Sequence, residues 1–181
     1  MQKKWMLSAM LVPWIVGCVS SSQPTSQEMV SSMERVDNHD GLIQHYKGHL
    51  QGDPEDVSVT QALAQVYFDK GDVESAKFYA DHLLNKGVKN AQLYQLRGQI
   101  HDKQGESELA VKRYTQSVDV GNRTSSIHVM LGVAFCKQDR FSEAEAEFNK
   151  ARLKGHNDVT IKNNLAVIYL AQVGTNMWLK C

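Results

Sequence analysis

The feature that most constrains this chain is a set of residues that recur every 34 positions. Small residues form one column, aromatic residues and a histidine a second, and glycines a third. These columns are Ala64, Gly98, Gly132 and Ala166; Tyr67, His101, Phe135 and Tyr169; and Gly87, Gly121 and Gly155. A period of about 34 residues is typical of a two-helix unit that buries its apolar face only by stacking on copies of itself. The spacing therefore predicts an all-α solenoid.

The repeat frame predicts three whole units, at 57–90, 91–124 and 125–158. In each unit the small residue and the ring three positions later share one face of a first helix. The small residue leaves room for a neighbouring helix to cross closely. The recurring glycine then ends the second helix, because glycine accepts the left-handed backbone found there.

Partial units are predicted at both ends of this array. Residues 28–56 read as a degenerate earlier repeat, with a short helical stretch near 28–36 and a second helix at about 40–56. Residues 159–181 read as a partial fourth repeat whose first helix covers about 159–172. The apolar residues that follow fit three interpretations: a cap that folds back, a docking segment for a partner, or a truncation relative to related genes.

This pattern resembles the tetratricopeptide repeat (TPR) family, whose signature is W-x2-L-G-x2-Y…A-x3-F…P. The best match is MLGVAF…FSEAEAEFNKA at residues 130–151, and Ala76, Ala110 and Ala144 supply the alanine of the signature. No unit carries the tryptophan, and Arg97 replaces leucine in the second unit, where Leu96 is a candidate substitute. The resemblance implies a TPR α-solenoid of stacked antiparallel helix pairs that binds proteins.

Residues 1–17 lie outside the repeats and read as a lipoprotein signal peptide. Two lysines precede an apolar stretch that is too short to span a bilayer, which takes about 20 residues, but that fits the core of a secretory signal. The stretch ends in Ile-Val-Gly-Cys18, which looks like a bacterial lipobox. The resemblance implies that Cys18 becomes the lipidated N-terminus, carrying diacylglycerol and a further acyl chain such as palmitate. The alternative is a plain signal peptide with a coincidental cysteine.

Two further inferences concern how the solenoid is anchored. Residues 18–27 comprise the lipidated cysteine and a Ser-rich polar segment, which predicts a flexible tether. Val19 follows the cysteine where an aspartate would retain a lipoprotein in the inner membrane. In the resemblance to lipoproteins of two-membrane bacteria, this favours lipid anchoring on the periplasmic face of the outer membrane.

Composition and motifs argue against nucleic-acid binding and catalysis. Twenty Lys and Arg residues balance twenty Asp and Glu residues without a basic stripe, so a nucleic-acid partner is not expected. No phosphate-binding loop or nucleophile motif is present, so we expect no enzyme activity and no cofactor. His45 and His49 have a spacing that can ligate zinc, but without a third ligand nearby we interpret them as surface and packing residues and predict no metal.

The family resemblance places a partner-binding groove along the first helices. Its predicted lining changes from amide-rich to apolar along the stack, which suits an extended peptide backbone at one end and apolar side chains at the other. The predicted residues are Gln61, Gln65, Phe68, Gln95, Gln99, Asp102, Val129, Val133, Cys136, Asn163, Val167 and Leu170. Basic residues are too few for the carboxylate clamp of chaperone-type TPR proteins. An alternative is that further chain covers the apolar end.

The overall layout resembles the TadD-type lipoproteins of tight-adherence (Flp) pilus systems. That resemblance rests on the lipobox, the tether, the number of repeats and the final segment NNLAVIYLAQ. It implies a non-enzymatic scaffold that assists assembly of the pilus or its secretin channel. Two alternatives remain open: a type IV pilus pilotin, and an adaptor lipoprotein that recruits peptidoglycan enzymes.

Overall fold

In the computed structural model, the described residues are 25–178, with side chains described as far as residue 173. The predicted signal peptide and Cys18 lie outside this range, as do Leu179, Lys180 and Cys181. The described residues form nine α-helices and no strand. The helices are α1 (Ser26–Arg35), α2 (His39–Gly52), α3 (Val57–Lys70), α4 (Val73–Asn85), α5 (Ala91–Lys103), α6 (Ser107–Asp119), α7 (Ser125–Cys136), α8 (Phe141–Leu153) and α9 (Asp158–Trp178).

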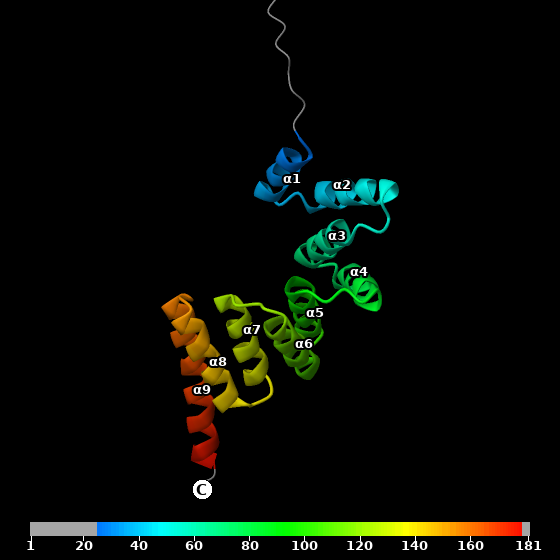
Figure 1. Ribbon diagram of the computed structural model, residues 1–181. Coiled ribbons are helices and arrows are strands. Elements are labelled where there is room, and N and C mark those ends of the chain that lie inside the picture. The colour runs from blue at the N-terminus through cyan, green and yellow to red at the C-terminus, as the bar shows by residue number, and fades with distance from the viewer. Residues whose placement is uncertain (1–24, 179–181) are drawn as a thin grey trace, which may run out of the picture.

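Successive helices pair and stack along a curved path from α1 to α9 (Figure 1). The pairs α3–α4, α5–α6 and α7–α8 lie within the three predicted units, and α1 and α2 form an earlier pair. First helices of neighbouring units also meet, α3 with α5 and α7 with α9. The predicted all-α TPR solenoid is confirmed.

The small-residue column marks the place where the two helices of a unit approach most closely. A Cβ atom built on Gly132 of α7 would lie 2.5 Å from the Phe148 ring of α8, which is fully buried. The Tyr114 ring of α6 approaches Gly98 of α5 in the same way. The absence of a side chain is therefore what allows an aromatic ring to seat against the facing backbone.

Helix boundaries depart from the predicted ones at both ends of the chain. Helix α1 begins at Ser26, inside the predicted tether, because Thr25 and Glu28 form a reciprocal capping box. At the other end α9 continues to Trp178, six residues past the predicted end of its helix. No glycine cap or proline interrupts it, and Gly174 alone does not end a helix.

Buried apolar side chains form two separate cores. One extends from Leu42 on α2 to Ile100 on α5, and the other from Ala110 on α6 to Ile168 on α9. Between them, α5 carries buried Arg97 and His101 where the other units carry leucine and an aromatic ring. We call these two residues and their partners Asp81 and Glu106 the polar seam.

Each polar side chain of the seam lies against an acidic partner. The Nε atom of Arg97 lies 2.8 Å from Asp81 Oδ1 as an ion pair without hydrogen-bond alignment, and His101 Nδ1 lies 2.6 Å from Glu106 Oε2. Burial lowers the pKa of the Arg97 guanidinium, with Asp81 opposing that shift. The hydrogen bond from His101 lowers the pKa of Glu106. Burial of Arg97 and His101 therefore depends on their acidic partners, Asp81 on α4 and Glu106 at the start of α6.

Candidate protein-binding groove

A cavity of about 480 Å³ opens between the first helices α3 and α5. We call it the amide cavity, and it is lined by Val57, Ser58, Gln61, Ala62, Gln65, Asn90, Gln92 and Leu96. Four of these residues carry side-chain amides and none is charged. Amides both donate and accept hydrogen bonds, so such a lining suits the uncharged backbone of an extended segment.

Some of the predicted groove amides are held by bonds to asparagines at the end of the same unit. Asn90 Nδ2 donates to Gln61 Oε1 at 2.8 Å, and Asn122 Nδ2 donates to Gln95 Oε1 at 2.8 Å. Each glutamine is thereby oriented, and its own NH2 group is left to donate. Gln99 is half-buried, with no side-chain hydrogen bond within the part of the chain that the structure describes.

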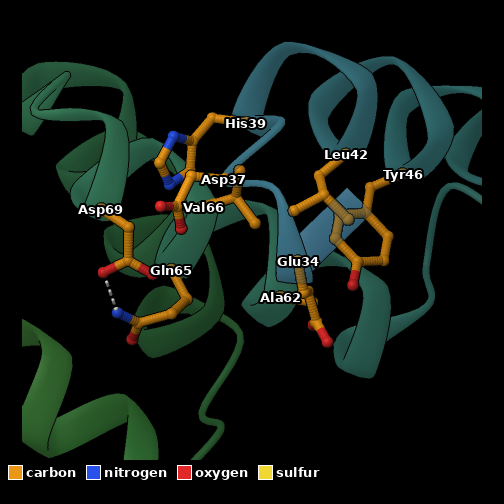
Figure 2. Close-up of a pocket in the computed structure, with 9 residues that line it drawn as sticks. All are labelled: Glu34, Asp37, His39, Leu42, Tyr46, Ala62, Gln65, Val66 and Asp69. Atoms are coloured by element: carbon orange, nitrogen blue, oxygen red, sulfur yellow. Dashed lines mark hydrogen bonds between the residues drawn. The ribbon is translucent and has the colours of Figure 1, made fainter. Parts of the chain in front are cut away.

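A second cavity, of about 350 Å³, lies where α1 and α2 face α3 (Figure 2). We call it the acidic cavity, and it is lined by Glu34, Asp37, His39, Leu42, Tyr46, Ala62, Gln65, Val66 and Asp69. Leu42 and Val66 are buried beneath it. Ala62 and Gln65 line both cavities, so the two adjoin across α3, and we call them together the groove.

The acidic cavity exists because the first unit is irregular. Helix α1 has ten residues and contacts mainly α2, whereas first helices elsewhere also meet their neighbours. The turn after α1 contains Asp37, whose backbone is left-handed with φ of 51°. Burial and the nearby Glu34 carboxylate raise the pKa of the Tyr46 phenol at this site.

The remaining predicted groove residues serve several purposes. Asp102 of α5 pairs with Lys137 at the end of α7 over 2.6 Å, which neutralises both charges and links two units. Phe68, Val129, Val133 and Cys136 are half-buried and pack against the two cores. Burial raises the pKa of the Cys136 thiol. These apolar residues are thus part of the solenoid's own packing.

Three predicted groove residues, Asn163, Val167 and Leu170, lie exposed on α9. No second helix covers this surface within residues 25–178, and the Leu170 side chain is 73% exposed. Val173, the first apolar residue of the predicted tail, is also exposed. The predicted exposure of Met177, Trp178 and Leu179 falls outside the described side chains.

Sequence reasoning missed part of the groove. Asn90 and Leu96 were not among its predicted residues. Asn90 could have been recognised as a helix N-cap, because asparagine is favoured there, and its side chain accepts a hydrogen bond from Leu93 N of α5 at 2.8 Å. The acidic cavity has no such signal. The cavity is present because α1 packs against α2 and leaves the adjoining surface of α3 uncovered.

The histidine pair on α2 lies against the start of α1. The two ring centroids are 4.6 Å apart, and Ser26 Oγ lies 3.2 Å from His45 Nε2 and 3.5 Å from His49 Nε2. Burial lowers the pKa of His45, with a smaller contribution from His49. Among the described residues, no three His, Cys, Asp or Glu side chains are grouped as metal ligands.

Within residues 25–178, none of the helices combines the length and the apolar character needed to cross a bilayer.

Comparison with known proteins supports the repeat assignment. Tetratricopeptide repeat models match residues 39–100 and 91–120. A protein of Haemophilus influenzae described as uncharacterized is 26% identical over 170 residues, which cover 92% of this chain and 81% of that protein.

Solved structures show the same fold at low sequence identity. The crystal structure of MamA superposes with a TM-score of 0.70 at 16% identity, covering 83% of this chain and 86% of that one. YrrB, described as a TPR protein with an unusual peptide-binding site, superposes with a TM-score of 0.66 at 18% identity, covering 78% and 73%. The chain is therefore an all-α solenoid that carries tetratricopeptide repeats over residues 39–120, and such repeats typically form protein–protein interaction scaffolds.

Proposed function

We propose that this protein is a lipid-anchored, non-enzymatic scaffold that holds an extended segment of a partner in its groove. The amide cavity carries this proposal, since it is concave, uncharged and lined by oriented hydrogen-bonding groups. That the structurally similar YrrB has a peptide-binding site supports the same use of the solenoid.

The cellular role that we propose is assembly of a tight-adherence pilus or its secretin at the outer membrane. Support comes from the lipobox-like sequence that ends at Cys18, the polar segment after it and the number of repeats. Placed on the periplasmic face, the scaffold would hold secretin or pilus subunits near the membrane in which they assemble. A pilotin for a type IV pilus would use the same groove on a secretin segment.

Charge placed inside the amide cavity is expected to abolish partner capture. We propose the double change Gln61→Glu and Gln92→Glu. A glutamate at position 61 still accepts from Asn90, so the fold is kept while carboxylates face the carbonyls of the bound segment. We expect a loss of about tenfold or more in partner recovered by chemical crosslinking in intact envelopes, because unpaired interfacial charge is costly.

The matched control is Gln44→Glu with Gln51→Glu, the same chemical change on the exposed face of α2 away from both cavities. Equal recovery from both double variants would show that the groove is assigned wrongly. Mass spectrometry of the captured partner separates the cellular roles. A secretin or pilus component supports the proposal, whereas a murein synthase or hydrolase supports the cell-wall alternative.

Removal of the thiol at position 18 is expected to release the protein from the membrane. We expect Cys18→Ser to move essentially all of the protein to the soluble fraction. The substitution removes two or three acyl chains, and each buried CH2 group of those chains contributes about 0.8 kcal/mol to membrane binding. Fractionation of envelopes with and without detergent measures this. Cys181→Ser is the control, and a Cys18→Ser protein that stays in the membrane would contradict lipid anchoring.

A further inference from the structure

We infer that the acidic cavity selects a partner segment that carries a basic side chain. This inference rests on the proposed function and specifies the chemistry of the segment that the groove would hold. The groove is continuous, because Ala62 and Gln65 line both of its cavities. A segment that crosses the amide cavity along α3 therefore reaches the acidic cavity next.

Three carboxylates line the acidic cavity, against one ionisable base, His39. Glu34, Asp37 and Asp69 come from α1, the following turn and α3, and no lysine or arginine lines the cavity. Glu34 and Asp37 make no ion pair or side-chain hydrogen bond with the described residues, and Asp69 accepts only a neutral amide bond, from Gln65 Nε2 at 2.9 Å. Figure 2 shows that bond and the three carboxylates around the cavity.

Two ion pairs near the groove are each neutral overall. Asp40 at the start of α2 is already paired with Lys70 over 2.6 Å, and it does not line the cavity. Further along the groove, Asp102 and Lys137 neutralise each other. The groove thus presents net negative charge at the α1 end and an uncharged lining between α3 and α5.

The cavity also accommodates the stem of a long basic side chain. Leu42, Tyr46, Ala62 and Val66 form an apolar lining beneath the carboxylates. Lysine and arginine bury their methylene stems along apolar surface while the charged end remains at the rim. The volume of about 350 Å³ lies within the usual range of about 300–1,000 Å³ for ligand clefts. The occupant is therefore a cationic side chain on an extended segment.

The first stage of the test maps the bound segment. The photoreactive residue benzoylphenylalanine replaces His39 in the acidic cavity or Gln92 in the amide cavity, and intact envelopes are irradiated. Peptide mass spectrometry then identifies each crosslinked segment. We expect both positions to capture one segment, with a lysine or arginine within about three residues of the site captured from His39, a reach that follows from about 3.3 Å of extended chain per residue.

The second stage measures charge recognition with the mapped segment as a synthetic peptide. The peptide and its version with glutamine in place of the basic residue are titrated by fluorescence anisotropy. We expect the basic peptide to bind the wild-type protein about five- to tenfold more tightly, and the difference to shrink at high salt. In Glu34→Gln with Asp37→Asn the difference should nearly vanish. It should persist in the control Glu108→Gln with Asp119→Asn on α6, which line neither cavity.

Each outcome separates the inference from the proposed function. Capture from Gln92 without capture from His39, or equal binding of the two peptides to wild-type protein, would overturn the inference and leave the groove function standing. Capture from neither position would overturn both. Thermal denaturation of each variant checks that the exposed carboxylates are dispensable for folding, as their lack of partners implies.

Discussion

Replacing Gly132 with alanine is expected to destabilise the protein by about 1–3 kcal/mol, although alanine is the better helix former. The added Cβ would lie 2.5 Å from the Phe148 ring, and the ring is fully buried and cannot move without disturbing its neighbours. Overpacking therefore outweighs the gain in helix propensity. Urea denaturation followed by circular dichroism measures the change.

Gly48 provides the matched control for this substitution. It lies inside α2, and a Cβ built there meets no atom within 4 Å. The same change at this position should stabilise the protein by about 0.5–1 kcal/mol, because only the unfolded chain loses freedom. Two glycine-to-alanine changes of opposite sign would establish the close approach at Gly132. A stabilising or neutral Gly132→Ala would contradict it.

Replacing Asn122 with alanine is expected to cost about 2–4 kcal/mol, because it breaks a buried hydrogen-bond network. The Nδ2 atom donates to Gln95 and to Ser117 Oγ, and the Oδ1 atom accepts from the backbone and hydroxyl of Thr124. Ser117 in turn donates to the carbonyl of Ala91. One amide thus connects α6 to the start of α7 and to a groove residue of α5.

The control for Asn122 is Asn85→Ala, at an exposed position near the end of α4, which we expect to change stability by less than about 0.5 kcal/mol. Chemical denaturation of both variants gives the comparison. A cost below about 1 kcal/mol at Asn122 would mean that water replaces the network readily. The variant should also weaken partner binding, because Gln95 loses the bond that orients it.

The repeat columns predicted the architecture because they record contacts within one unit. Gly132 and Phe148 lie on paired helices of one unit, so their contact recurs at fixed spacing and leaves a periodic trace. The predicted left-handed glycines are confirmed at Gly87, Gly121 and Gly155, with φ of 81°, 109° and 79°. Contacts of this kind can be found without any knowledge of how the units curve.

The groove was harder to predict because the bonds that orient its amides do not follow the repeat columns. Gln61 and Gln95 were expected to face a partner. Each also accepts a hydrogen bond from an asparagine near the end of its own unit. Those asparagines occupy different positions in the repeat, 90 and 122, so no column revealed them. The acidic cavity depends on where the short α1 settles, which no periodic pattern specifies.

The polar seam has a consequence for how one repeat depends on the next. Arg97 on α5 pairs with Asp81 on α4, and His101 pairs with Glu106 at the start of α6, so the seam joins three consecutive helices. A buried guanidinium that loses its acidic partner is costly, so α5 could not keep Arg97 buried if α4 came away. Fraying that starts at the N-terminal end of the solenoid is therefore expected to stop at α4.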